Sequence, residues 1–305
     1  MGILEIRGLR KSFGRQTVLN SLDMEVPEHS VFGFVGQNGA GKTTTMKIVL
    51  GLLRADGGEA YVCGDKVTYG ETKTNRSIGF LPDVPEFYGY MRPMEYLRLC
   101  GDVTGLGRAQ SAARGAELLS LVGLGGEKKK IGGFSRGMKQ RLGIAQALLN
   151  EPRLLICDEP TSALDPIGRK EILDILLKIR GKTTVVFSTH ILSDVEKICD
   201  RIAVLHNGTL ALHGTLAEIK KRRRSDGFVI EFSSAEDTSA FERLEELRQP
   251  SLLLTREENT LSITTADIDA GGHLLLDLLA KSRVVPLKFA AAEPTLERLF
   301  EEVVQ

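Results

Sequence analysis

The sequence has no tryptophan, no excess of charge of either sign and only four cysteines in 305 residues. Forty lysine and arginine residues balance forty aspartate and glutamate residues. No overall field therefore draws the protein towards nucleic acid, and any basic site must be local. No two cysteines stand in CxxC spacing, which argues against a disulfide framework or a zinc site and favours a reducing compartment.

Long apolar runs are also missing. The N-terminal segment MGILEIRGLRKSFG has no apolar core of the kind that a secretion signal needs. No stretch approaches the roughly eighteen apolar residues of a membrane-spanning helix. We therefore expect any role at a membrane to depend on a partner.

Short apolar runs and amphipathic helices alternate in the first part of the chain. The runs Val31–Val35, Leu154–Cys157 and Thr184–Ser188 are typical of buried strands. Helical spacing of apolar residues follows the first run over Thr43–Leu53 and precedes the third over Pro166–Ile179. This alternation predicts an α/β fold with a mostly parallel sheet covered on both faces. Alternating edge-type strands are expected before it, at residues 3–7 and 18–26.

The length allows two domains, and the composition suggests where they divide. We expect a first domain at residues 1–219, with a helical insert over about 84–149. The basic run KKRRRSD at residues 220–226 is best explained as a solvated linker, and contact with anionic lipid headgroups is the alternative. The pattern of residues 227–305 predicts, in order, a strand, a helix, two strands, a helix and a strand, and then a last helix from Pro294. That order predicts a small α+β domain of the ferredoxin-like type. Its strands are expected at Phe228–Phe232, Leu252–Thr255, Leu261–Thr264 and Val284–Phe289, and its helices at Glu236–Leu247 and His273–Lys281.

A glycine-rich loop follows the first buried run. Residues 36–43, GQNGAGKT, match the pattern G-x-x-x-x-G-K-[ST], whose backbone amides surround phosphate groups at the start of a helix. Lys42 should reach the β and γ phosphates, and the Thr43 hydroxyl should ligate Mg²⁺. A chance glycine turn would not need the strand before it and the helix after it. The candidate nucleotide-binding residues here are Gly36, Asn38, Gly39, Ala40, Gly41, Lys42, Thr43 and Thr44.

Two carboxylates end the second buried run. Residues 154–159 read LLICDE, and a buried parallel strand delivers its C-terminal residues to the ligand crevice of an open α/β sheet. Asp158 is a candidate for holding Mg²⁺ through water, and Glu159 for acting as the general base. The alternative is that the carboxylates cap the next helix. The pairing with the glycine loop favours the catalytic interpretation.

Three further motifs narrow the family. FSRGMKQR at residues 134–141, SALD at 162–165 and STH at 188–190 follow the glycine loop and the carboxylates in the order found in ATP-binding subunits of ABC transporters. The resemblance extends over residues 1–219. It implies an ABC ATPase core that uses ATP and Mg²⁺.

The resemblance also implies roles for single residues. Ser135 and Gly137 would bind the γ-phosphate held by the opposite subunit, and Asp165 would cross the dimer interface. His190 would contact the γ-phosphate and the attacking water, whereas a lone histidine is more often a core residue. Phe13, in KSFG, corresponds to the aromatic residue that stacks on adenine; its alternative is a packed strand residue.

The chain departs from the family pattern in two motifs. Arg136 and Met138 stand where the family usually has glycine and glutamine. In IGFLPD at residues 78–83, Asp83 stands where glutamine is common. Asp83 is a candidate Mg²⁺ ligand, because a carboxylate binds the cation more strongly than an amide. Its side chain is shorter by one methylene, which leaves direct coordination open, and the alternative is that Asp83 only transmits closure to the permease.

The motifs resemble the branch that serves exporters of drugs, antibiotics and lantibiotic peptides. The segments that carry this resemblance are residues 134–141, the Asp83 loop and PTLERLF at 294–300. The branch implies a separate membrane permease that docks near residues 84–101, where Phe87, Tyr88, Tyr90 and Met91 cluster. Ordinary packing of the insert is the alternative.

The leading hypothesis is therefore an ATPase at the cytoplasmic face of the membrane, attached through its permease. It would close over two ATP and Mg²⁺ as a homodimer or with a sister subunit, and no nucleic-acid partner is expected. A soluble ABC ATPase acting on ribosomes or DNA is disfavoured by the single cassette and the lack of a heptad run. The third hypothesis is a regulatory or assembly protein, in which the C-terminal domain is the active part.

Overall fold

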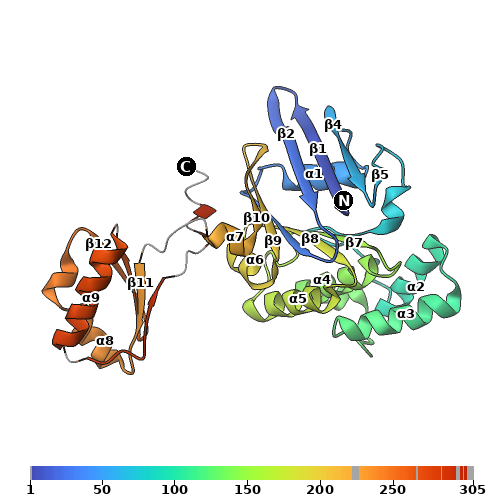
Figure 1. Cartoon of the computed structure of the whole chain (residues 1–305). Coiled ribbons are helices and arrows are strands. Elements are labelled where there is room, and N and C mark those ends of the chain that lie inside the picture. The colour runs from blue at the N-terminus through green and yellow to red at the C-terminus, as the bar shows by residue number, and fades with distance from the viewer. Residues whose placement is uncertain are drawn as a thin grey trace. The chain divides into compact units, whose positions relative to one another are not determined.

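The computed structural model of the protein describes residues 2–221, 227–265, 267–282, 284–292, 296–297 and 299–300 (Figure 1). These residues form two compact units. The first comprises the chain up to Leu216, and the second runs from Ala217 to Leu299. Among the described residues no helix is both long enough and apolar enough to cross a membrane.

A six-stranded sheet forms the centre of the first unit, in the order β10–β9–β3–β8–β7–β6. Its strands are β3 (Val31–Val35), β6 (Ile78–Leu81), β7 (Leu154–Asp158), β8 (Thr184–Thr189), β9 (Arg201–His206) and β10 (Thr209–Thr215). All neighbours are parallel except β9 and β10. The strands β3, β7 and β8 are buried along their whole length, as expected for a parallel sheet covered on both faces.

An antiparallel sheet in the order β2–β1–β4–β5 lies over one face of the central sheet. It contains β1 (Leu4–Phe13), β2 (Gln16–Val26), β4 (Gly57–Val62) and β5 (Asp65–Lys66). Alternate residues of β1 and β2 point into a core shared with Phe32 and Phe34 of β3 and with helix α1 (Lys42–Val49). Helix α1 is shorter than the expected Thr43–Leu53, because the chain turns at Gly51, where φ is 68°.

Helices cover the other face of the central sheet. Close approaches mark where they pack: a Cβ on Gly79 of β6 would lie 2.2 Å from the carbonyl oxygen of Ala147 in α4 (Arg136–Ala147). A Cβ on Gly33 of β3 would lie 2.9 Å from Cys199, which follows α6 (Leu192–Ile198). Helix α5 (Pro166–Ile179) packs between α4 and α6.

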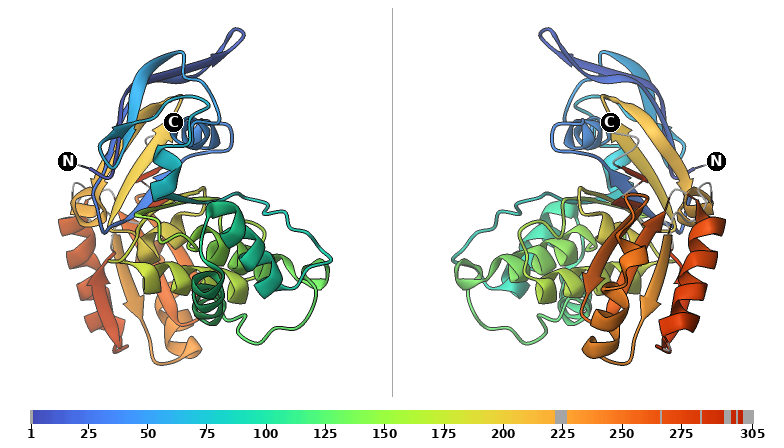
Figure 2. Two further views of the ribbon diagram at one scale, coloured as in Figure 1. Left: turned by 90° about the vertical axis from the view of Figure 1, so that its right-hand side faces the viewer. Right: turned by 90° about the vertical axis from the view of Figure 1, so that its left-hand side faces the viewer.

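The predicted helical insert is present but is less helical than expected. Within residues 84–149 the α-helices are α2 (Pro93–Thr104), α3 (Arg108–Leu121) and α4, joined by loops and the 3₁₀ turn η2 (Ile131–Gly133). The 3₁₀ turn η1 (Thr74–Ser77) precedes β6. Figure 2 shows α2 and α3 grouped at one end of the first unit, away from the antiparallel sheet.

The second unit contains the predicted order of strands and helices. A sheet in the order β12–β13–β11–β14 is antiparallel throughout, and one face carries the apolar core under the helices. The elements are β11 (Gly227–Glu231), α8 (Ala235–Glu242), η3 (Glu245–Arg248), β12 (Leu252–Glu257), β13 (Thr260–Thr265), α9 (Ile268–Ser282) and β14 (Lys288–Ala291). This is the ferredoxin-like arrangement.

Two predicted segments are described only in part. The expected linker at 220–226 begins inside helix α7 (Leu216–Lys221), and its residues 222–226 lie outside the described residues. Residues 296–297 and 299–300 are helical, in the region where a last helix was expected. Pro294, the expected start of that helix, lies outside the described residues.

Candidate nucleotide-binding site

Four neighbouring parallel strands end at one edge of the central sheet. There β3 leads into the glycine loop, β7 into Glu159, β8 into His190 and β6 towards Asp83. The register places Val35 beside Thr189 and Asp158 beside Ser188. Segments far apart in the sequence therefore meet at this edge, which is the usual ligand site of an open α/β sheet.

The glycine loop has a backbone that other residues would strain. Gly41 has a φ of 110°, and a Cβ on Gly36 would lie 2.7 Å from the carbonyl oxygen of Leu205. Lys42, the first residue of α1, is buried. Its ammonium group donates hydrogen bonds to the carbonyl oxygens of Gly36 (2.6 Å) and Gln37 (3.2 Å).

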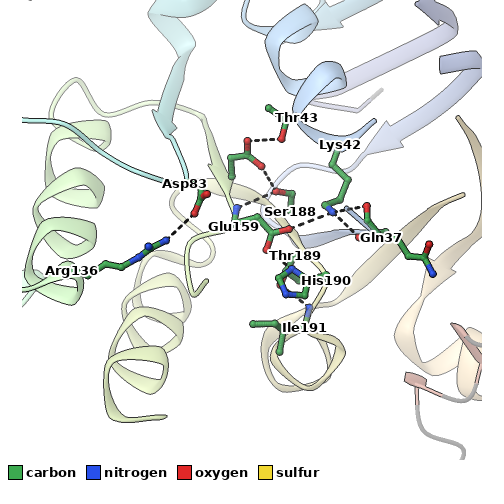
Figure 3. A network of polar contacts seen from close by, with 12 residues as sticks. Gln37, Lys42, Thr43, Asp83, Arg136, Glu159, Ser188, Thr189, His190 and Ile191 are labelled. Atoms are coloured by element: carbon green, nitrogen blue, oxygen red, sulfur yellow. Dashed lines mark hydrogen bonds and ion pairs between the residues drawn. The ribbon is translucent and has the colours of Figure 1, made fainter. Parts of the chain in front are cut away.

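The hydroxyl groups of Thr43 and Ser188, both labelled in Figure 3, hold the two carboxylate oxygens of Asp158. Thr43 Oγ1 donates to Asp158 Oδ2 at 2.8 Å, and Ser188 Oγ donates to Oδ1 at 2.6 Å. The Ser188 hydroxyl also accepts the backbone N–H of Glu159 at 3.1 Å. Residues of three elements, α1, β7 and β8, are thus joined through one carboxylate. Burial, reinforced by the neighbouring Asp158, raises the pKa of the Cys157 thiol, so this cysteine stays protonated and unreactive.

Glu159 occupies a strained position between two cationic or polar groups. Its φ is 48°, in the left-handed region that costs a non-glycine residue about 1–3 kcal/mol and is frequent at functional sites. Its Oε2 lies 3.0 Å from His190 Nδ1, and its Oε1 lies 3.4 Å from Lys42 Nζ. The Lys42 contact is an ion pair rather than an aligned hydrogen bond. His190 is half exposed at this edge, not a core residue.

These groups surround a cleft of about 450 Å³, called here the nucleotide cleft. Its lining residues are Asn38, Gly39, Gly41, Lys42, Thr43, Thr44, Asp83, Asp158 and Glu159. Among the described residues, no three histidine, cysteine or acidic side chains gather into a metal-binding group. Mg²⁺ at phosphate sites takes one or two carboxylates, with substrate phosphates and water completing its shell. The adjacent Thr43 hydroxyl and Asp158 carboxylate fit that donor set.

The residues expected to face a second subunit lie together elsewhere. Ser135 caps α4 by accepting the Met138 N–H at 3.2 Å, and Asp165 caps α5 by accepting the Gly168 N–H at 3.3 Å. Ser135, Gly137 and Asp165 line one groove of about 340 Å³, called here the signature groove. The sequence motifs at 134–141 and 162–165 therefore form one surface.

Phe13 stands apart from both sites. It ends β1, its side chain is 50% exposed, and the Lys11 ammonium lies 5.3 Å from its ring centroid. An exposed aromatic ring at the tip of a hairpin is not the packed strand residue of the alternative interpretation.

The sequence alone did not reveal the partners of two site residues, Asp158 and Asp83. Ser188 belonged to a recognised motif, but its contact with Asp158 depends on the register of β7 and β8. Asp83 lines the nucleotide cleft, yet its Oδ1 lies 3.2 Å from Nη2 of Arg136, 53 positions along the chain. The available signal for this pair was that both residues depart from the family pattern.

Comparison with known proteins supplies the family. The ABC transporter family model matches residues 19–162. The uncharacterized ABC transporter ATP-binding protein YxlF of Bacillus subtilis (strain 168) is 37% identical over 303 residues, which is 99% of both chains. The chain belongs to the family of ABC transporter ATP-binding proteins. The bacitracin transport ATP-binding protein BcrA of Bacillus licheniformis is 37% identical over 247 residues, which cover 80% of this chain and 79% of BcrA.

The solved structures agree with this family. A structure described as the ATP-binding subunit of an ABC transporter is 33% identical, with a TM-score of 0.65, over 72% of this chain and 92% of that one. The predicted fold class, the resemblance to antibiotic and lantibiotic exporter ATPases and the ATPase activity are thereby confirmed. As an ABC transporter ATP-binding subunit, the chain binds and hydrolyses ATP.

Proposed function

We propose that this subunit drives an exporter by closing, as a homodimer or with a sister subunit, over two molecules of MgATP. The observation that carries the proposal is the separation of two half-sites within one chain. The nucleotide cleft and the signature groove are lined by separate sets of described residues. A second subunit would bring its signature groove to this cleft and complete the site. The direction of transport is inferred from the resemblance to the branch that serves exporters of drugs, antibiotics and lantibiotic peptides.

The phosphate-binding step falls to the glycine loop and Lys42. The Lys42 ammonium group donates hydrogen bonds to Gly36 O and Gln37 O and forms an ion pair with the Glu159 carboxylate. Phosphate oxygens would replace the two carbonyls as charge-assisted acceptors, which are stronger partners. Thr43, Asp158 and Asp83, which line the same cleft, would hold Mg²⁺, whose positive charge would offset the negative charge of the phosphates. The exposed ring of Phe13 would stack on the adenine.

Hydrolysis would use Glu159 as general base. The Glu159 carboxylate would take a proton from the attacking water while the water oxygen bonds to the γ-phosphorus and the bond from that phosphorus to the β,γ-bridging oxygen breaks, so that ADP leaves. His190, 3.0 Å from the carboxylate, would orient Glu159 and the water. Ser135 and Gly137 of the opposite subunit would bind the γ-phosphate, and Asp165 would lie at the interface.

A separate permease would hold the subunit at the cytoplasmic face of the membrane. Tyr88 and Tyr90 are 55% and 66% exposed, and their rings lie 5.9 Å apart, next to the edge-on pair of Phe87 and Tyr96. Exposed aromatic side chains are enriched at protein interfaces. This cluster supports docking at residues 84–101.

The test is a variant that binds ATP without hydrolysing it. Glu159→Gln keeps the shape of the side chain but removes the proton acceptor, so this variant should accumulate as a closed dimer in the presence of MgATP. Size-exclusion chromatography should show a dimer with MgATP and a monomer with ADP. Glu117→Gln, the same change at a side chain of α3 that is 62% exposed and lines neither the nucleotide cleft nor the signature groove, should hydrolyse ATP normally. A Glu159→Gln variant that hydrolyses ATP at the wild-type rate would exclude Glu159 as the base.

A further inference from the structure

Two of the three positions that depart from the family pattern contact each other. Asp83 follows β6, and Arg136 is the first residue of α4 after its cap Ser135. Their side chains form an ion pair at 3.2 Å, and they are 47% and 42% exposed. Figure 3 shows the two side chains pointing at one another across the space between β6 and α4.

A second contact fixes the backbone beside this ion pair. Gln140 is fully buried, and its Nε2 donates to the backbone carbonyl of Asp83 at 2.6 Å. Arg136 and Gln140 are four residues apart and so lie on one face of the helix. The main chain of Asp83 is therefore attached to α4 by Gln140, while its carboxylate forms an exposed ion pair, its only hydrogen bond or ion pair with a side chain among the described residues.

The carboxylate has two possible partners. Asp83 lines the nucleotide cleft with Thr43 and Asp158, whereas Arg136 lines the signature groove with Ser135 and Gly137. Rotation about its side-chain bonds is enough to change partners, because the backbone is held by Gln140. The guanidinium and a cation in the cleft would compete for this carboxylate, because each cation neutralises the negative charge that attracts the other.

We propose that Arg136 is a positioning residue for the nucleotide cleft of its own chain, because it holds the Asp83 carboxylate and competes for it with the divalent cation that accompanies ATP. This inference rests on the proposed Mg²⁺ role of Asp83. Linkage requires the competition to act both ways: binding of the cation weakens the ion pair and frees the guanidinium beside Ser135. Occupancy of the cleft is thus communicated to the signature groove of the same chain.

The experiment measures how much the cation improves nucleotide binding. The full-length chain is titrated calorimetrically with the β,γ-imido analogue of ATP, once with Mg²⁺ and once with EDTA. The ratio of the two dissociation constants is the cation factor. Exposed ion pairs are worth little, so Arg136→Gln should raise the cation factor by about two- to fivefold. Arg136→Lys keeps the charge and should stay near the wild-type value.

A double-mutant cycle separates the ion pair from a general effect of charge. Asp83→Asn should lower the cation factor, and Arg136→Gln should have no further effect in the Asp83→Asn background. Lys139→Gln, which removes the same charge from the same helix, should leave the factor unchanged. Both paired residues are at the surface, and melting curves should show that all variants fold.

Three results would overturn the inference. In the first, Arg136→Gln has the same cation factor as the wild type. In the second, Arg136→Gln changes the cation factor equally in the wild-type and Asp83→Asn backgrounds. In the third, Asp83→Asn leaves the cation factor unchanged. Each of these leaves nucleotide binding intact and so differs from a failure of the proposed function. If the proposed function itself were wrong, the wild-type chain would not bind the analogue, or Glu159→Gln would not form the dimer.

Discussion

At the scale of single residues, one buried hydroxyl organises the catalytic edge. Ser188 donates to Asp158 and accepts the backbone N–H of Glu159. It therefore fixes the carboxylate expected to hold the metal and the strained backbone of the expected base. The hydroxyl is fully buried, so no water can take over its two hydrogen bonds without rearrangement.

Ser188→Ala should lower the rate of ATP hydrolysis by about tenfold or more, since a hydrogen bond to a charged group contributes about 1.5–3 kcal/mol. Ser30→Ala is a control, because that hydroxyl makes a partly buried hydrogen bond to the carbonyl of Pro27 at the opposite end of β3. The control should lower the melting temperature but leave turnover unchanged. Steady-state ATPase rates and melting curves measure both effects, and equal turnover in the two variants would contradict the role of Ser188.

At the scale of elements, the helices, strands and loops that local chemistry determines were the easiest to predict from the sequence. The glycine loop was predictable because positions such as Gly41 need a backbone that only glycine adopts easily. The strands β3, β7 and β8 were predictable because strands buried on both faces are apolar throughout.

Elements that depend on distant partners were harder to predict. Strands β4 and β10 are mostly half-buried or exposed, and they form by pairing with β1 and β9. The contacts of the candidate site were missed for the same reason. Spacing along the chain does not show that Asp83 meets Arg136 or that Asp158 meets Ser188, because each contact is set by how the strands and α4 pack.

The core of the second unit allows a prediction for its elements. Phe241 of α8 is fully buried, and its ring lies 5.4 Å from that of Phe232, which follows β11. Phe241→Ala should destabilise this unit by about 3–5 kcal/mol, because it removes contacts and leaves a cavity. Leu253→Ala in β12, where the side chain is 67% exposed, should change the stability by less than about 0.5 kcal/mol.

Calorimetric unfolding of the full chain measures these changes. The affinity for MgATP, measured below the unfolding transition, should be the same in both variants, since Phe241 belongs to a core formed within residues 228–289. A loss of ATP affinity in Phe241→Ala alone would mean that the second unit supports the nucleotide site.

At the scale of the whole molecule, the fold separates groups that one reaction needs together. The central sheet brings Lys42, Asp158, Glu159 and His190 to one edge, while the caps of α4 and α5 place Ser135 and Asp165 on another groove. Each chain would thus carry the receiving half of one site and the closing half of another. Two-fold symmetry satisfies both halves at once, because an isologous interface uses each surface twice.

This arrangement predicts a variant that separates ATP binding from closure. Ser135→Arg places a long cationic side chain where the partner's γ-phosphate should lie, but it leaves the nucleotide cleft of its own chain unchanged. Introduced into Glu159→Gln, it should abolish the MgATP-dependent dimer. The affinity of the monomer for MgATP should be retained, because Lys42 and Thr43 are untouched. Gly133→Arg in the same background is the matched control: it adds the same side chain two residues away, where a Cβ meets nothing within 4 Å. Size-exclusion chromatography should show a dimer for the control and a monomer for Ser135→Arg. A dimer in both would mean that Ser135 does not lie against the opposite nucleotide, and that the site is complete within one chain.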